Sequence, residues 1–253
     1  MSHIFFGFRI LFLFVISVAF VNGAASKPFD IGERLEYDLK WSFFPVGSAV
    51  LEVHPKAKIN GNSCYLLKFS VRTNSFADSF YKVRTSIESY VKDDFSKSIL
   101  YLKSQSEGKT KRKVEVKFDY QKGEAIYKLS KKNHSTVKIP DKVFDPLAIA
   151  YLFRFKEMKE NKSWEIPTSD GKRFSKLNVR IGKIQKVSVP AGKFNAFEVF
   201  PEMKKLRGVF NKSPDGKLKV WYSNDSKRLP IKISSKVVVG SFHAELAGVA
   251  KNK

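Results

Sequence analysis

Residues 33–54, ERLEYDLKWSFFPVGSAVLEVH, decide the fold class of this chain of 253 residues. Apolar and polar side chains alternate along the first nine residues, and one face collects Leu35, Tyr37, Leu39 and Trp41. The alternation returns over residues 47–54, where Ala49, Leu51 and Val53 are in register. A period of two is typical of a strand with one buried face, whereas a helix repeats about every 3.6 residues. The stretch therefore predicts two strands, 33–41 and 47–54.

The same alternation continues along the rest of the chain. Further strands are predicted at 64–71, 87–91, 99–106, 114–120, 125–129, 136–139, 164–166, 174–181, 184–189, 194–200, 218–222, 230–239 and 241–250. Turn-forming residues separate many of them: Asn60-Gly61, Lys122-Gly123, Asp170-Gly171, Pro190-Ala191-Gly192 and Asp215-Gly216. Such residues tolerate the backbone angles of tight reversals. Successive hairpins predict a mainly β chain, folded as a single large antiparallel β-barrel or half-barrel-like domain.

One helix is predicted, over about residues 145–159. Asp145 suits the N-cap, and Pro146 suits the first helical position, where its missing N–H costs nothing. The next seven residues, LAIAYLF, are apolar on every side, so the first two turns are expected to be buried. A buried helix in a β protein plugs the sheet as a structural element or, less often, covers a ligand cavity as a lid.

The first 23 residues are predicted to be a secretory signal peptide. Arg9 precedes an uninterrupted apolar run from Ile10 to Val21, and small residues follow, so cleavage is expected near residues 23–25. A run of this length fits a signal peptide, whereas a membrane-spanning helix needs ~20 apolar residues. An uncleaved N-terminal anchor is the alternative. We expect a periplasmic or secreted protein with one domain over residues 24–253 and no transmembrane segment in the mature chain.

The chain is strongly basic, with a net charge of +23 from 47 Lys and Arg against 24 Asp and Glu. Such a surface attracts anions, including nucleic acid, anionic lipid head groups and acidic polysaccharide. Only ten of the 47 cations are arginine, however, and forked recognition of phosphate or carboxylate favours arginine over lysine. We therefore expect a general compositional bias, no specific nucleic-acid partner, and docking on an anionic envelope polymer as an alternative role.

The motifs of common enzymes and metal sites do not occur. The triplet Gly108-Lys109-Thr110 resembles the end of a phosphate-binding loop, but the residues after it alternate like a strand, and that loop needs a helix. The histidines of the mature chain, His54, His134 and His243, are not spaced as metal ligands, and Cys64 is the only cysteine. We expect no metal and no cofactor. A hydrolase with carboxylates on separate strands would leave no sequence signature, so enzymatic activity stays open.

The segment Phe80-Tyr81-Lys82-Val83-Arg84 interleaves aromatic and basic residues. Such interleaving occurs on nucleic-acid stacking platforms, but no complete nucleic-acid-binding motif accompanies it. Its alternation favours an amphipathic strand with Tyr81 and Val83 facing inward.

Several segments, in order along the chain, are similar to one known family. They include residues 32–41 (GERLEYDLKW), 81–89 (YKVRTSIES), 145–154, 187–194 (VSVPAGKF), 218–233 (LKVWYSNDSKRLPIKI) and 240–246 (GSFHAEL). On these segments the chain resembles the DUF3108 family, a group of bacterial exported proteins of unknown function. The resemblance implies a periplasmic or secreted β-barrel-like domain, and it implies no reaction.

Polar residues within these segments have two interpretations. Contact between Asp225 and Arg228 would brace a turn, and Arg154 on the apolar helix needs a partner if it is buried. Each could instead face an anionic ligand; we favour bracing. Our candidate ligand-binding residues are Trp41, Tyr81, Arg84, Arg154, Trp221, Asp225 and Arg228.

Three functions remain from the sequence. The first is a non-catalytic binding or carrier domain, in which a curved sheet lined by Tyr37 and Trp41 and covered by the helix at Asp145 holds a lipid or another apolar ligand. The second is an interaction protein that docks on anionic envelope polymers through its lysines. The third is a cell-wall hydrolase. The sequence does not specify the oligomeric state.

Overall fold

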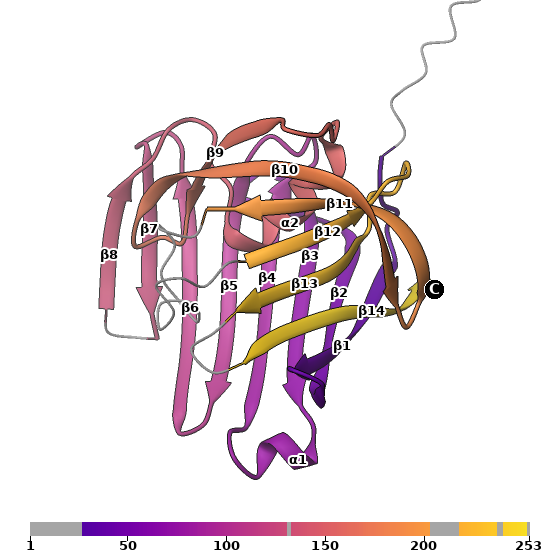
Figure 1. Cartoon of the computed structure of the whole chain (residues 1–253). Coiled ribbons are helices and arrows are strands. Elements are labelled where there is room, and N and C mark those ends of the chain that lie inside the picture. The colour runs from indigo at the N-terminus through magenta and orange to yellow at the C-terminus, as the bar shows by residue number, and fades with distance from the viewer. Residues whose placement is uncertain (1–26, 131–132, 203–217, 237–239, 252–253) are drawn as a thin grey trace, which may run out of the picture.

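A computed structural model describes residues 27–130, 133–202, 218–236 and 240–251 (Figure 1). The predicted signal peptide and the Asp215-Gly216 turn lie outside these residues. The strands are β1 (Glu33–Trp41), β2 (Phe44–Ile59), β3 (Asn62–Thr73), β4 (Val83–Lys92), β5 (Ser98–Glu107), β6 (Thr110–Asp119), β7 (Glu124–Leu129), β8 (Asn133–Lys138), β9 (Ser163–Ser169), β10 (Phe174–Val189), β11 (Gly192–Pro201), β12 (Leu218–Ser223), β13 (Pro230–Lys236) and β14 (Ser241–Lys251). The helices are α1 (Ser75–Asp78) and α2 (Pro146–Phe155).

All of these strands form one antiparallel sheet, in the order β8-β7-β6-β5-β4-β3-β2-β1-β14-β13-β12-β11-β10-β9. Two meanders, β1 to β8 and β9 to β14, join through the pairing of β1 with β14. The sheet curls so that β9 to β14 cross in front of the first meander (Figure 1). The edge strands β8 and β9 do not pair with each other within the described residues, so the sheet stays open. The prediction of an antiparallel, half-barrel-like β fold is confirmed.

Local backbone geometry explains the tight turns. Asn60 and Gly61 have φ angles of 48° and 77° and reverse the chain between β2 and β3. Positive φ at both positions is what a two-residue hairpin requires. The two strands predicted at 174–181 and 184–189 are one continuous strand, β10, because the break between them is a register shift and not a turn.

The predicted strand Phe80–Arg84 is wrong in its first half. β4 begins only at Val83, and the chain before it forms the short helix α1, which the alternation does not predict. The backbone N–H of Tyr81 donates to Ala77 O at 2.8 Å instead of to a neighbouring strand. Tyr81 is consequently 55% exposed, and the expectation that it faces the core is also wrong.

Helix α2 begins as predicted. The Asp145 side chain accepts hydrogen bonds from the N–H groups of Leu147 and Ala148 at 2.9 and 3.0 Å. The helix ends at Phe155 and not at 159, because Lys156 has extended backbone angles. The Asp145 carboxylate also accepts from the hydroxyls of Ser89 and Ser98, at 2.6 Å each, which fastens the start of the helix to β4 and β5.

The core lies inside the curl, around α2 (Figure 1). The helix packs against β3 and β4 on one side, while Phe153 meets Trp164 of β9 and Tyr222 of β12 on the other. Most of its side chains are buried, and Tyr37, expected to line a cavity, is 3% exposed and donates to Pro230 O at 2.7 Å. Helix α2 is therefore an element of a packed core and not a lid at the surface.

Candidate functional site

Exposed aromatic residues gather at the end of the molecule that carries α1. Eleven large hydrophobic residues of the described chain are exposed, and seven of them belong to this one end. We call these seven the aromatic end: Trp41, Phe43, Phe44, Phe76, Phe80, Tyr81 and Phe242. Burying one such side chain stabilises a protein by about 1.5–3 kcal/mol, so a cluster left in water marks a binding surface.

A groove of about 480 Å³ lies within this end. It is formed by the β1–β2 hairpin, the α1 segment, and the facing starts of β4 and β14. Its walls are Trp41, Phe44, Val46, Thr73, Phe76, Ala77, Phe80, Tyr81, Val83 and Phe242. Ligand pockets in proteins span roughly 300–1,000 Å³ and are mostly apolar, so both size and lining fit a small apolar ligand.

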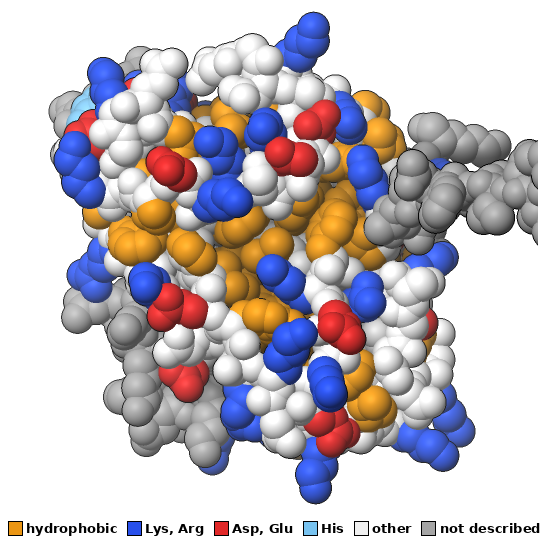
Figure 2. Space-filling view, turned by 90° about the horizontal axis from the view of Figure 1, so that it is seen from above, with side chains coloured by type: hydrophobic (Ala, Val, Ile, Leu, Met, Phe, Trp, Pro, Cys, Tyr) orange, Lys and Arg blue, Asp and Glu red, His pale blue; other side chains and the backbone are white. Residues whose placement is uncertain are grey.

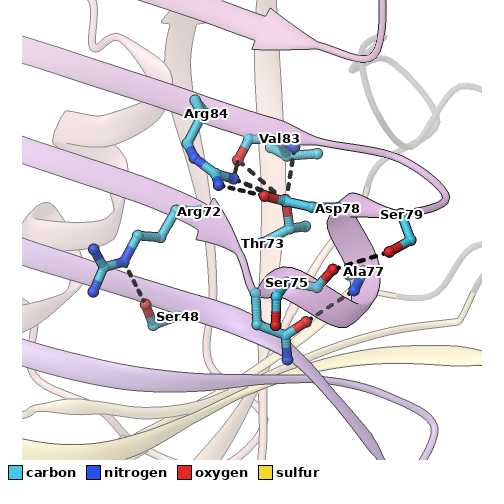
Figure 3. Close-up of polar contacts among 10 residues, drawn as sticks. Ser48, Arg72, Thr73, Ser75, Ala77, Asp78, Ser79, Val83 and Arg84 are labelled. Atoms are coloured by element: carbon cyan, nitrogen blue, oxygen red, sulfur yellow. Dashed lines mark hydrogen bonds and ion pairs between the residues drawn. The ribbon is translucent and has the colours of Figure 1, made fainter.

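A polar network holds α1 in place (Figure 3). Arg84 of β4 donates to the Asp78 carboxylate twice, Nη2 to Oδ2 at 2.6 Å and Nη1 to Oδ1 at 3.0 Å. Thr73 at the end of β3 also donates its hydroxyl to Asp78. That hydroxyl accepts from the Val83 N–H at 2.9 Å and from Arg84 Nη1 at 3.0 Å. The network ties the end of β3, α1 and the start of β4 together.

Asn74 caps α1 and attaches it to β2. Its side-chain oxygen accepts from the Ala77 N–H at 2.9 Å, and its amide donates to Pro45 O at 2.9 Å. Its backbone N–H donates to Val46 O at 3.0 Å. Asparagine at an N-cap stabilises a helix start, and here the same side chain joins two walls of the groove.

The electrostatics of the network favour its charged form. The hydrogen bond from Arg84, and then that from Thr73, lowers the pKa of Asp78, and the bond to Asp78 raises the pKa of Arg84. Because the Thr73 hydroxyl is already hydrogen-bonded within this network, the groove offers few free polar groups. It is therefore suited to bind a ligand by shape and apolar contact.

Three of the sequence-predicted site residues come together here. Trp41 and Tyr81 are walls of the groove, and Arg84 lies behind α1 as the partner of Asp78. Arg84 consequently positions the groove and does not line it.

Arg154, Asp225 and Arg228 lie in a separate cluster. Arg154 is fully buried, and its guanidinium binds the Glu33 carboxylate at 2.5 and 2.8 Å, Pro28 O at 2.5 Å and Lys227 O at 3.0 Å. Asp225 accepts from the backbone N–H of Arg228 at 2.9 Å, and the Arg228 side chain donates to Arg154 O at 3.0 Å. These contacts brace the β12–β13 turn against α2 and the N-terminal segment.

Trp221 lies on β12 away from both groups. It is half-buried, opposite Glu198 of β11 and Lys232 of β13. This register places it on the face of the sheet that carries ion-paired side chains, such as Glu198 and Lys219 at 2.7 Å.

Sequence reasoning missed most of the aromatic end. Phe43, Phe44, Phe76, Phe80 and Phe242 were not among the predicted residues. The usable signal was two adjacent phenylalanines, Phe43-Phe44, at a hairpin turn, and the four-residue spacing of Phe76 and Phe80. Neighbouring strand residues face opposite sides, so two consecutive large apolar residues at a turn cannot both enter a core.

A second groove, of about 440 Å³, lies on the outer face of β4 to β7. Its charged side chains are mixed in sign, and its two carboxylates face lysines: Glu88 with Lys68 at 3.3 Å and Glu115 with Lys128 at 3.7 Å. Such pairs suit a solvated sheet surface.

Among the described residues, no group of three or more His, Cys, Asp or Glu side chains is placed to hold a metal ion. No helix in the part of the chain that the structure describes is long and apolar enough to cross a membrane.

Basic side chains do not gather in one patch on the face that Figure 2 shows. Lysines and arginines lie around its rim and between apolar side chains, with carboxylates interspersed (Figure 2). This distribution agrees with a general lysine bias on that face.

The single curled antiparallel sheet, packed around one helix and open at an apolar end, defines a β-barrel-like protein. The chain belongs to the DUF3108 family, described as proteins of unknown function, whose model matches residues 36–247. No curated protein matches the chain at a significant level.

Three solved structures are similar to this chain, and the first of them shares its fold. A β-barrel-like protein of the DUF1849 domain of unknown function from Brucella abortus superposes with a TM-score of 0.59 at 14% identity, covering 88% of this chain and 98% of that chain. A candidate exported protein with a YmcC-like fold from Bacteroides fragilis gives a TM-score of 0.36 at 9% identity, covering 88% of this chain and 98% of that one. A candidate lipoprotein from Parabacteroides distasonis gives 0.32 at 9%, covering 87% and 96%.

Proposed function

We propose that this protein is an exported, non-catalytic binding protein whose groove takes one apolar chain, such as the acyl chain of an envelope lipid. The observation that carries the proposal is the aromatic end itself, seven exposed large side chains around a groove of about 480 Å³. A chain that merely folded would bury these rings, because burial stabilises and exposure invites aggregation.

The chemistry of the groove selects the class of ligand. Rings and alkyl groups form nearly all of its walls, and the hydroxyl of Thr73 is already engaged by Asp78, Val83 and Arg84. A polar ligand would lose its hydrogen bonds to water without replacement, which costs free energy. An acyl chain makes no hydrogen bonds to water, so it does not lose any when it enters the groove.

The groove is built to stay open. Phe76 and Phe80 meet at 5.5 Å between ring centroids on a segment that the Asp78–Arg84 pair and the Asn74 cap hold in place. Holding these wall residues in place before binding lowers the entropy lost when a ligand enters. This distinguishes the aromatic end from a loop that exposes apolar residues by chance.

Export completes the proposal. The predicted signal peptide precedes a segment that is integrated into the fold, since Phe29 is 5% exposed and Pro28 O accepts from Arg154. Cleavage near residues 23–25 would leave this segment intact. An envelope location would place the groove among lipids.

Binding of a fluorescent undecanoic acid probe tests the function. Ala77 lines the groove on α1, so Ala77→Trp should fill it and weaken binding at least about tenfold. The matched control is Ala250→Trp, at an exposed position near the end of β14. No saturable binding by the wild-type protein, or equal binding by both variants, would overturn the proposal.

Docking on an anionic polymer is the second candidate, and the net charge of +23 supports it. Retention on heparin through a salt series tests it, since charge-driven binding must weaken as salt rises. A cell-wall hydrolase has less support, because Asp78, the carboxylate closest to the groove walls in sequence, is engaged by Arg84 and Thr73.

A further inference from the structure

The aromatic end carries more exposed apolar surface than the groove needs. Phe43 is 76% exposed and does not line the groove, although its ring lies 4.2 Å from that of Phe44 between centroids. It extends the apolar surface outward from the β1–β2 hairpin. A groove that took its ligand from water would gain nothing from a ring in this position.

Cations border the same surface. Gly108, at the turn of the β5–β6 hairpin, donates its N–H to Lys82 O at 2.8 Å. A Cβ at Gly108 would lie 2.8 Å from Cε2 of Tyr81, so the hairpin turn and the ring are in contact. The hairpin continues with the exposed cations Lys109 and Lys111, beside exposed Lys82. Its cations therefore lie next to the aromatic end.

Exposed aromatic rings bordered by lysines match the chemistry of the interface of a lipid bilayer. Trp and Tyr side chains favour the level of the head groups, Phe enters the acyl boundary, and Lys binds anionic head groups. Trp41 and Tyr81 carry the amphipathic rings, Phe43 and Phe80 extend furthest into solvent, and the β5–β6 hairpin supplies the charge. The indigo start of the described chain lies at the end opposite α1 (Figure 1).

We propose that the aromatic end docks on the surface of a bilayer that contains anionic lipid, with Phe43 inserted and Lys82, Lys109 and Lys111 against the head groups. The inference rests on the proposed function, because docking brings the groove to the acyl chains it takes. The charge of the hairpin commits the site to an anionic bilayer instead of a second copy of this basic chain, which like charges would repel.

Co-sedimentation of the full mature chain with vesicles tests the docking. Binding should occur with phosphatidylglycerol vesicles, weaken with salt, and be much weaker with phosphatidylcholine alone. Phe43→Ser and the pair Lys109→Glu with Lys111→Glu should each weaken it about tenfold or more. The control Ile184→Ser, which removes a side chain that is 41% exposed on β10, should leave it unchanged.

Two variants separate docking from ligand binding. Phe43→Ser should bind the soluble undecanoic acid probe as well as the wild type does, because Phe43 lies outside the groove walls. Ala77→Trp should lose the probe and still bind vesicles. Probe binding without vesicle binding would overturn the docking and leave the function standing. Loss of vesicle binding in Ala77→Trp would also overturn the docking proposal. So would a wild-type protein that forms a dimer instead of binding vesicles, if Phe43→Ser abolishes that dimer.

Discussion

The guanidinium of Arg84 contacts both carboxylate oxygens of Asp78, at 2.6 and 3.0 Å, across the base of the segment that presents Phe76 and Phe80 (Figure 3). Five residues separate these two in the chain, and the loop between them forms one wall of the groove. The pair therefore closes the loop without taking part in the apolar surface. Its removal should change the groove more than the fold.

Asp78→Asn tests whether the pair orders the groove without stabilising the whole fold. The pair is partly exposed, and such pairs contribute little to folding, so the denaturation midpoint should move little. Amide hydrogen exchange of residues 74–82 should instead rise, and affinity for the undecanoic acid probe should fall. Asp93→Asn, which breaks the Lys56 pair at 3.1 Å at another turn, is the matched control and should leave both unchanged. Unchanged exchange in Asp78→Asn would show that the pair does not order α1.

The same pair predicts an acid dependence. Arg84 lowers the pKa of Asp78 in the folded protein, so the contribution of the pair is present above the ordinary aspartate pKa and is lost as pH falls through the lowered value. Protection of residues 74–82 against exchange, corrected for intrinsic rates, should therefore decline below about pH 4. Asp78→Asn should remove this local decline, and a variant that keeps it would assign the effect to another group.

Arg154 should matter for stability. Arg154→Met leaves the Glu33 carboxylate buried without its partner, which should lower the free energy of unfolding by about 3–5 kcal/mol. Adding Glu33→Gln should recover part of the loss, because no unpaired charge remains. Arg34→Met, at the partly exposed pair with Glu52 and Glu36, should cost about 1 kcal/mol or less. Urea denaturation measures all of these, and a similar small loss for both arginines would refute the bracing role.

Asp145 should be the most costly helix cap to remove. Asp145→Ala deletes the cap and leaves the hydroxyls of buried Ser89 and Ser98 without their acceptor, so the loss should exceed about 2 kcal/mol. Asn74→Ala removes the cap of α1, where no second buried side chain depends on it, and should cost about 1 kcal/mol. Equal losses would mean that the serine contacts contribute nothing.

Much of the fold could be predicted from the sequence because its signals are local. Alternation over residues 33–41 gave the bounds of β1, and Asn60-Gly61 gave the β2–β3 turn. The Asp145-Pro146 pair likewise gave the start of α2. The pairing of β1 with β14 could not be predicted, since it joins residues at the two ends of the chain.

The candidate site was less predictable. Trp41 and Tyr81 were proposed because of their residue type, yet Tyr81 was expected to face the core. The short helix α1 depends on contacts of Asn74 and Asp78 with β2 and β4, which no local pattern reveals. Arg84 was proposed as a ligand contact, whereas its position behind α1 gives it the role of holding the wall.

The central claim is that the groove holds an apolar chain, and organic extraction followed by mass spectrometry tests it most directly. Wild-type protein and Ala77→Trp would be purified in parallel from envelope fractions, with Ala250→Trp as the matched control. We predict near-stoichiometric lipid with the wild type and with Ala250→Trp, and little with Ala77→Trp. No lipid with the wild type, or the same amount with all three proteins, would contradict the account.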